Sequence, residues 1–447
     1  MKKYENYKDS GLEWLGIVPE HWRTMKMKYL FSFGRGLNIT KSDLVEDGTP
    51  VISYGQIHSK ANTGVAVKEE LLRFVPTDIT SAHPENKVHI GDFIFADTSE
   101  DKEGCGNCAY IDREGIYAGY HSLVLDGKGR DNKYFAYLFK SEPWRIQIRS
   151  KASGVKVFSI TQTIMGESTV ILPTLIEQRA IVSYLDHKVG QIDALISEKE
   201  KMVEDLKVYR SSLITETVTK GLDKEVEMKD SGVEWIKKIP ATWTTVLLKR
   251  CATIMTGGTP STDIDRYWAN PTFRWYTPSD FSDDDVVLND SSRKLDETAI
   301  KEYAAKLFPK NSVLIVGIGA TLGKVGISLN ECSSNQQVNA IIFNSTVLPE
   351  YGAYYLLAGK EYIKSQSNAA TLPILNQSTM GELQIVVPTI EEQKDIVGFI
   401  NKKVSVIKES IENLQIQISD LKSYKSSLIT EAVTGKIDLR DWQTKKS

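Results

Sequence analysis

The chain contains two phrases that each occur twice, and this repetition constrains its fold more than any other feature. Residues 8–14 read Lys-Asp-Ser-Gly-Leu-Glu-Trp, and residues 229–235 read Lys-Asp-Ser-Gly-Val-Glu-Trp. A second phrase begins Pro-Thr-Leu-Ile-Glu-Gln at 173–178 and returns as Pro-Thr-Ile-Glu-Glu-Gln at 388–393. The distance between the two copies of each phrase far exceeds the roughly 20–50 residues of solenoid and propeller repeats, so we interpret the chain as two fused halves. About 150 residues in each half scarcely resemble each other, a pattern typical of one frame that presents two different recognition surfaces.

Each second phrase opens a long predicted helix with the same capping device. Thr174 precedes Glu177 by three residues, and Thr389 precedes Glu392 by three. In such a capping box the threonine hydroxyl and the glutamate carboxylate satisfy backbone amides that the first helical turn leaves free. The spacing therefore predicts helix starts directly after Pro173 and Pro388.

The two helices are predicted to end at Gly221 and Gly435, because glycine readily adopts the left-handed backbone that stops a helix. Each would run about 45 residues, or roughly 65 Å at 1.5 Å per residue. Gly190 weakens the first helix near its start, so a kink or break is expected there.

Apolar residues recur along both helices in steps of three and four, which predicts a coiled-coil seam of about four heptads. Since both seams belong to one chain, the simplest arrangement pairs them with each other, antiparallel about a pseudo-two-fold axis. Pairing between two chains is the alternative. The predicted seam comprises Val189, Ile192, Ile196, Val203, Leu206, Leu213, Val404, Ile407, Ile411, Leu414, Ile418, Leu421 and Leu428.

The repeat also predicts a circular organisation. Residues 220–223 lead from the first helix directly into the second frame phrase, whereas few residues follow the second helix. The N-terminal segment 1–24 should therefore pack beside the end of the second helix.

Composition bounds the class of protein. A formal net charge of −3 argues against a chain coated in positive charge, although local patches could still bind DNA. No apolar run approaches the roughly 20 residues of a membrane span, and residues 1–5 lack the apolar core of a signal peptide, so we expect a cytoplasmic protein. Cys105 and Cys108 form a single C-x-x-C motif without further ligands, which favours free thiols over a metal site.

Residues 25–170 and 246–385 are predicted to be mixed α+β domains. Short strand-like runs between Gly, Asn and Asp turns support this reading, at 49–54, 92–96, 312–316 and 338–343. Related phrases at 160–166 and 375–381 close the two regions, so we expect both to share one fold.

No catalytic constellation can be assigned. Gly317–Lys324 resembles a phosphate-binding loop, but Ile318 occupies the position of a required glycine and Val325 follows the lysine where Ser or Thr is needed. We interpret it as a strand and a tight turn. Residues 270–273, Asn-Pro-Thr-Phe, lack the second proline of an amino-methyltransferase motif.

Loops of both variable regions instead carry side chains suited to reading nucleic acid. Gln and Asn can bind adenine through two hydrogen bonds, Arg and Lys can bind guanine, and Thr, Ser and Lys suit phosphates. Any one of them alone is more often an ordinary solvated loop residue, so the prediction rests on the set. The set comprises Tyr54, Gln56, His58, Thr98, Ser99, Lys102, Arg274, Tyr276, Thr277, Ser279, Thr321, Lys324, Gln336 and Gln337.

Together the repeated phrases, with the closing Leu-Ile-Thr-Glu-x-Val-Thr motif, resemble the specificity subunits of type I restriction-modification systems over the whole chain. The resemblance implies a non-catalytic, DNA-binding subunit whose two target recognition domains each read one half of a split DNA sequence. It implies two methyltransferase subunits and further restriction-translocase subunits as partners. S-adenosylmethionine and ATP would be bound by those partners, with no cofactor or metal on this chain. A duplicated adaptor that binds protein or glycan is the alternative.

The resemblance also suggests a division of the chain. Residues 1–172 would hold the first recognition domain with its frame segment, and 223–387 the second. The spacer helices would occupy 173–222 and 388–435, followed by a tail at 436–447. Four tryptophans of the frame would either dock the methyltransferase subunits or anchor the recognition domains to the helices: Trp14, Trp22, Trp235 and Trp243.

Overall fold

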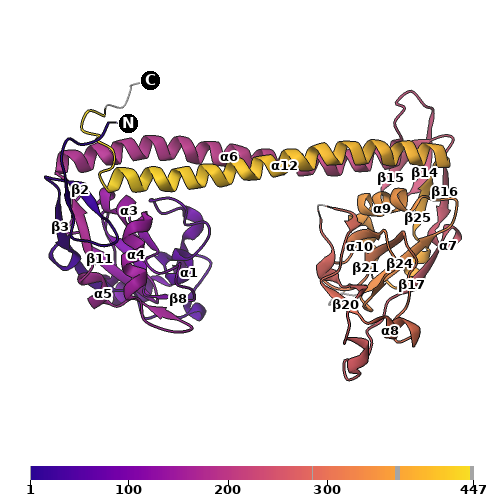
Figure 1. Cartoon of the computed structure of the whole chain (residues 1–447), viewed down its shortest axis with the longest axis horizontal. Coiled ribbons are helices and arrows are strands. Elements are labelled where there is room, and N and C mark those ends of the chain that lie inside the picture. Colours follow the sequence, from indigo (N-terminus) through magenta and orange to yellow (C-terminus); the bar gives the residue numbers. More distant parts are fainter. Residues whose placement is uncertain (1, 284, 368–372, 443–447) are drawn as a thin grey trace. The chain divides into compact units, whose positions relative to one another are not determined.

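The computed structural model describes residues 2–283, 285–367 and 373–442, and the chain divides into two compact units (Figure 1). The first unit contains Met1–Glu200 and Ile416–Ser447, and the second contains Lys201–Gln415. Two long helices contribute to both units, α6 (Leu175–Lys220) and α12 (Ile390–Val433). Their bounds lie within three residues of the predicted spacer segments.

The first unit is built around an antiparallel sheet in the order β4-β11-β7-β9. A three-stranded sheet, β10-β5-β6, and three strand pairs, β1-β2, β3-β13 and β8-β12, accompany it. β7 is a continuous apolar run whose four residues are all buried, which suits a central strand. The strands are β1 (Tyr7–Asp9), β2 (Ile17–Pro19), β3 (Arg23–Lys26), β4 (Ser32–Arg35), β5 (Thr49–Ile52), β6 (Arg73–Val75), β7 (Phe93–Ala96), β8 (Thr98–Ser99), β9 (Cys108–Tyr110), β10 (Tyr117–Ala118), β11 (Ser122–Asp126), β12 (Phe158–Ser159) and β13 (Thr169–Leu172). The α-helices besides α6 are α1 (Tyr54–Ile57), α2 (Thr77–Ala82), α3 (Lys133–Lys140), α4 (Glu142–Lys151) and α5 (Gln162–Gly166).

The second unit repeats this plan with additions. Its main sheet has the order β17-β24-β21-β22-β19, and a three-stranded sheet, β20-β18-β23, and two strand pairs, β14-β15 and β16-β25, accompany it. The strands are β14 (Met228–Val233), β15 (Ile236–Pro240), β16 (Thr244–Leu247), β17 (Ala252–Thr256), β18 (Phe273–Tyr276), β19 (Val287–Leu288), β20 (Arg293–Leu295), β21 (Ser312–Val316), β22 (Val325–Ser328), β23 (Ser333–Ser334), β24 (Val338–Phe343) and β25 (Gln384–Val387). The α-helices besides α12 are α7 (Leu248–Cys251), α8 (Glu297–Lys301), α9 (Pro349–Ala358), α10 (Lys360–Ser365) and α11 (Gln377–Gly381). The expectation that both variable regions share one fold is confirmed.

The long helices pair within the chain, as predicted, and they are antiparallel. In the first unit the Lys425 ammonium lies 2.6 Å from the Asp193 carboxylate, and the Lys199 ammonium donates to Gln417 over 2.7 Å. The residue number thus rises along α6 as it falls along α12. α6 continues through Gly190 without a break, so the break that was one of the two expectations there is wrong: the packing of its neighbours outweighs the weak helix propensity of one glycine.

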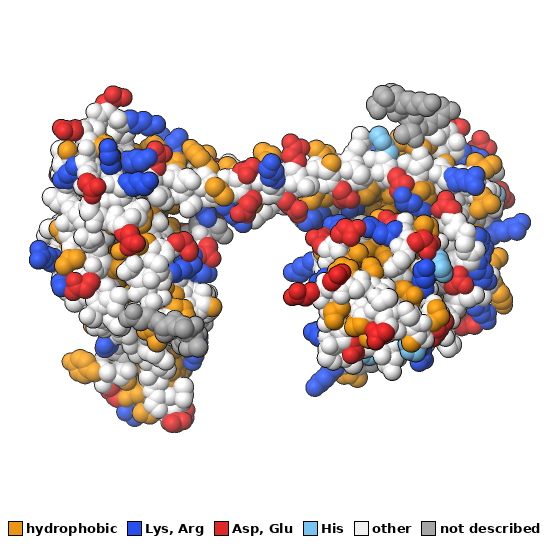
Figure 2. Space-filling view, turned by 180° about the vertical axis from the view of Figure 1, so that it is seen from behind, with side chains coloured by type: hydrophobic (Ala, Val, Ile, Leu, Met, Phe, Trp, Pro, Cys, Tyr) orange, Lys and Arg blue, Asp and Glu red, His pale blue; other side chains and the backbone are white. Residues whose placement is uncertain are grey.

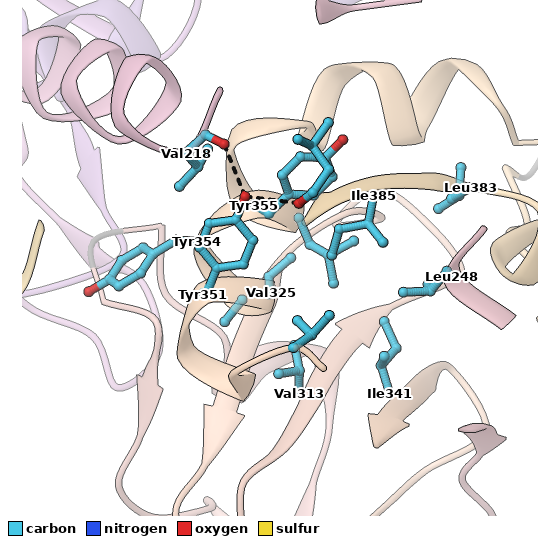
Figure 3. Packing of buried hydrophobic residues seen from close by; sticks show 14 of the residues in the cluster. Val218, Leu248, Val313, Val325, Ile341, Tyr351, Tyr354, Tyr355, Leu383 and Ile385 are labelled. Atoms are coloured by element: carbon cyan, nitrogen blue, oxygen red, sulfur yellow. Dashed lines mark hydrogen bonds between the residues drawn. The ribbon is translucent and has the colours of Figure 1, made fainter. Parts of the chain in front are cut away.

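Most of the predicted seam is buried. Ten of the thirteen residues are in the core, and Leu206, Val404 and Leu421 are partly buried. At the domain ends the same helices join the domain cores. Figure 3 shows Val218 of α6 beside Tyr351 of α9, whose hydroxyl donates to the carbonyls of Val218 and Val386. Tyr134 of α3 donates in the same way to Val433 near the end of α12, over 3.0 Å.

A buried tryptophan joins two helix ends in each unit. The Trp22 indole donates to the Glu177 carboxylate at the start of α6 over 3.1 Å, and a Cβ on Gly435 would lie 3.1 Å from its ring. The Trp243 indole donates to Glu392 over 3.2 Å, and Gly221 lies equally close to its ring. Both glycines have positive φ, 76° at Gly221 and 73° at Gly435. For these two tryptophans, the structure supports the anchoring role.

The N-terminal segment packs beside the end of α12, which confirms the predicted circular organisation. The Asp438 amide donates to the Lys2 carbonyl over 2.9 Å, and the Tyr7 hydroxyl donates to the Gly435 carbonyl over 3.2 Å. The Lys436 ammonium donates to the Ile17 carbonyl over 2.7 Å. In the second unit the corresponding frame segment follows α6 without interruption of the chain. In the first unit these hydrogen bonds hold the separate N-terminal segment beside the end of α12.

Candidate nucleic-acid interface

One position of the repeated fold carries different polar side chains in the two units. In the first unit β11 pairs with β7, with Ser122 opposite Ala96, and in the second β24 pairs with β21, with Val338 opposite Val316. Ser122 and Val338 are therefore equivalent. The two residues before them are Tyr120 and His121 in one unit, and Gln336 and Gln337 in the other.

A close backbone approach beside this position is shared by both units. The Gly36 amide donates to the Ser122 carbonyl and the Gly257 amide donates to the Val338 carbonyl. A Cβ on Gly36 would lie 1.9 Å from the Gly119 carbonyl oxygen, and one on Gly257 would lie 2.3 Å from the Asn335 carbonyl oxygen. Glycine is thus required at both places, because any side chain would collide with the facing backbone.

In the first unit this position forms an aromatic cluster. The ring of Tyr54, in α1, lies 5.6 Å from Tyr120 and 5.5 Å from His121. His121 has a positive φ of 50°, and its imidazole is 3.5 Å from Asp97. Both ring nitrogens of His58 are engaged, one with the Thr98 carbonyl at 2.8 Å and the other with the Asn107 side-chain amide at 3.1 Å. Aromatic faces and imidazole donors suit stacking on bases and hydrogen bonding to base edges.

Some of the other predicted residues of the first unit are occupied in local structure or buried, and one is exposed. Gln56 accepts from the Ser53 amide as part of a capping box, and Ser99 is buried, 5% exposed, in the β8-β12 pair. Lys102 is exposed in the following loop. The Ser99 side chain is therefore inaccessible to a ligand in this structure, and the Gln56 side chain is occupied by a local hydrogen bond.

In the second unit the same position opens onto a groove of side-chain amides. Its volume is 520 Å³, and its polar lining comprises Thr256, Gln336, Asn339, Asn376, Gln377 and Ser378. The Gln336 side-chain oxygen accepts from Thr259 over 2.6 Å, and the Gln377 amide donates to Thr256 over 2.7 Å. Among the described residues, the NH₂ of Gln336 and the oxygen of Gln377 make no hydrogen bond. One donor and one acceptor together complement the edge of adenine.

Several predicted residues of the second unit have structural roles instead. Tyr276 is fully buried and donates to the Leu288 carbonyl, so its proposed contact with DNA is not possible as it lies here. Thr277 forms a capping box with Asp280, and its hydroxyl lies 2.8 Å from that of Ser279.

The remaining predicted residues of the second unit are two cations in ion pairs and a threonine in a turn. Arg274 lies 3.5 Å from Asp290, and Lys324 lies 3.1 Å from Asp283. Lys324 and the partly buried Thr321 belong to a tight turn between β21 and β22, which confirms that the glycine-rich stretch opens no helix. Both cations are already paired with acids of their own unit.

Sequence reasoning missed Tyr120, His121, Asn339 and Gln377. The first two precede β11 exactly where the predicted Gln336 and Gln337 precede β24. The signal that could have found them was a strand alignment between the halves. The dissimilar residues hid that alignment.

The surface is of mixed charge. Figure 2 shows Lys and Arg side chains interspersed with Asp and Glu over the visible face of each unit. Cys105 and Cys108 are buried free thiols, and burial raises the pKa of Cys108 to about 11. Within the described ranges, no three His, Cys, Asp or Glu side chains gather as a metal site would require. Among those same residues, no helix has both the length and the apolar composition of a membrane span.

Comparison with known proteins identifies the family. The type I restriction modification DNA specificity domain matches twice, at residues 19–205 and 240–420. The MjaIX specificity subunit of Methanocaldococcus jannaschii is 34% identical over 197 residues, 43% of this chain and 43% of that protein. The putative MjaX specificity subunit of the same organism is 22% identical over 98% of both chains, and the StySPI specificity subunit of Salmonella potsdam is 20% identical over 94% of this chain and 90% of its own length.

The fold is also found among solved structures. A chain from a study of complex assembly and conformational transition in the type I R-M system aligns with a TM-score of 0.70 at 16% identity, covering 93% of this chain and 98% of that one. The family domain matches more than half of the present sequence, in two copies that coincide with the two repeated halves. The chain therefore belongs to the family of type I restriction-modification DNA specificity subunits.

Proposed function

We propose that this chain is the DNA-reading subunit of a type I restriction-modification complex and has no catalytic site of its own. Each unit would read one half of a bipartite DNA target. The observation that carries this proposal is the equivalence of Tyr120 and His121 with Gln336 and Gln337. One scaffold offering different side chains at one position is what two unlike half-sites require.

The base-reading residues follow from this equivalence. In the first unit we assign Tyr54, Tyr120 and His121, which lie together and are at least partly exposed. In the second unit we assign Gln336 and Gln377, whose available donor and acceptor favour an A·T pair in that half-site. Lys102 and Thr98 are suited to phosphate contacts that position the duplex without specifying its sequence.

The long helices would set the number of unread base pairs between the half-sites and also receive the partners. Two methyltransferase subunits and the restriction-translocase subunits would assemble on the chain, with S-adenosylmethionine and ATP bound by those subunits. Apolar side chains more than half exposed on the two helices support a protein-docking role. They are Leu175, Ile176, Val208 and Tyr209 on α6, and Val406, Ile416 and Tyr424 on α12.

The proposal is tested by co-expressing the chain with its methyltransferase subunit and mapping methylated adenines across a host genome by single-molecule sequencing. The expected result is a split motif of two unlike half-sites with a fixed gap. A stable complex that adds no methylation, or a continuous motif, would contradict the proposal. The chain would then fit the alternative of a duplicated adaptor for protein or glycan, which DNA-competition binding separates from a DNA reader.

A further inference from the structure

A cationic hollow of the first unit lies next to the residues assigned to base reading, since Ile57 of α1, the helix that carries Tyr54, is part of its lining. It has a volume of 240 Å³ and lies where α12 meets the first domain. Its lining includes Ser59, Lys140, Arg145, Lys422, Lys425 and Ser426. Four positive side chains thus face one small space.

Carboxylates compensate two of these four cations. Lys425, whose side chain is 14% exposed, lies 2.6 Å from Asp193 of α6. Lys422 lies 3.1 Å from Glu200, and more than half of each of these side chains is exposed. Both acids are engaged with these lysines on the paired helices, so neither is left over for the rest of the hollow.

The other two cations have no acidic partner among the residues that the structure describes. Lys140, the last residue of α3, makes no hydrogen bond or ion pair through its ammonium within the described part of the chain. One terminal NH₂ of Arg145 donates to Asn107 over 2.6 Å and to the Glu103 carbonyl, but its Nε–H is buried without a partner. Burial lowers the pKa of Lys140, and the nearby Lys425 and Arg145 act in the same direction. Lys140 is partly buried and the Arg145 Nε–H is fully buried, so an anion in the hollow would offset the cost of removing these charges from water.

We propose that this hollow is a binding site for a phosphate oxyanion, either free phosphate or a phosphate of a nucleic-acid backbone. An oxyanion would accept charge-assisted hydrogen bonds from Lys140 and Arg145, with the hydroxyls of Ser59 and Ser426 as further donors. The volume is below the roughly 300–1,000 Å³ of sites for larger ligands, which fits a single tetrahedral group. The proposed ligand is a phosphate and not a base, so the proposal does not depend on the proposed half-site specificity.

The test is phosphate binding by the full chain, measured by calorimetric titration and by thermal unfolding against sodium chloride at matched ionic strength. Lys140→Met removes the unpaired charge and retains the length of the side chain. Lys133→Met is the matched control, because Lys133 begins the same helix but pairs with Asp186 outside the hollow. We expect phosphate to raise the Tm of the wild type and of Lys133→Met in proportion to occupancy. In Lys140→Met the phosphate affinity should fall at least about tenfold.

Ser426→Ala provides a second variant at an exposed position of α12, where we expect folding to be retained, and should weaken phosphate binding about threefold. A short duplex of unrelated sequence separates the two sources. If a backbone phosphate occupies the hollow, the duplex raises the wild-type Tm through Lys140 and free phosphate competes with it. If free phosphate is the ligand, the duplex leaves the Lys140-dependent shift unchanged. Equal phosphate responses in wild type and Lys140→Met, or a chloride response equal to that of phosphate, would overturn the proposal.

Discussion

The buried carboxylate of Glu177 offers a sharp test of how the frame is held together. It is 3% exposed and accepts four hydrogen bonds: from the Thr174 amide and hydroxyl at 3.0 and 2.7 Å, from the Trp22 indole at 3.1 Å, and from the His21 ring at 2.8 Å. Glu177→Gln keeps the shape but replaces one accepting oxygen with an NH₂ group, so one pair of donors must face another donor. Since a hydrogen bond to a charged group contributes about 1.5–3 kcal/mol, we expect a loss of about 2–4 kcal/mol.

Glu392→Gln is the matched control from the second unit. Glu392 accepts from Trp243 at 3.2 Å and from Thr389, but it is only partly buried, and no histidine bonds it in the described residues. Water can satisfy a displaced donor there, so the expected loss is about 1 kcal/mol.

Differential scanning calorimetry measures the comparison. For a unit of this size, 1 kcal/mol corresponds to about 2–4 °C in Tm, so Glu177→Gln should lower the transition of the first unit by about 4–16 °C. Hydrogen exchange of peptides at the start of α6 assigns the transition to that unit. A Glu177→Gln effect no larger than that of Glu392→Gln would refute the reasoning, because burial and donor number would then not control the cost.

Three further predictions concern the proposed base-reading residues, the long helices and the frame. Gln336→Leu should relax base preference about tenfold or more at one position of the second half-site only, whereas Tyr120→Leu should alter only the first; methylome sequencing of each complex shows whether the effects separate. Deleting seven residues from both α6 and α12 should retain both half-sites and shorten the gap by about 10 Å, or about three base pairs, and altered half-sites in the same assay would contradict this. Burial opposes charge on Glu177, but hydrogen bonds from Thr174, Trp22 and His21 outweigh it and hold its pKa below the usual range. Its stabilisation is therefore complete above the unfolded pKa near about 4.3 and disappears as pH falls through the lower folded pKa, so acid titration of unfolding should show a shallower loss for Glu177→Gln than for the wild type.

The sequence predicted the long-range plan because its signals are local and repeated. Both capping boxes form as expected, with Thr174 bonded to Glu177 and Thr389 bonded to Glu392. The runs at 312–316 and 338–343 are β21 and β24 with the same bounds. Capping, heptad spacing and apolar runs depend on neighbouring residues, so they can be read without knowing the tertiary structure.

The candidate site could be predicted only in part, since residue type does not report burial or pairing. Tyr276 and Gln336 are both plausible base readers by type. One lies in the core with its hydroxyl bonded to a carbonyl, and the other lines an open groove. The partners of Lys324 and Arg274 are acids distant enough in sequence that no spacing rule pairs them.

By itself the sequence determined that this protein is a duplicated frame with two long, paired helices and two α+β domains of one fold. It could do so because repetition, caps and heptads are written in local order. Only the tertiary structure decided which side chains lie together at the proposed base-reading site of each unit. Strand register brings Tyr120 to Tyr54, and Gln336 and Gln377 to a single groove, from segments far apart in the chain. It also showed which charges of the hollow beside α12 lack a partner, because that depends on every neighbouring element at once.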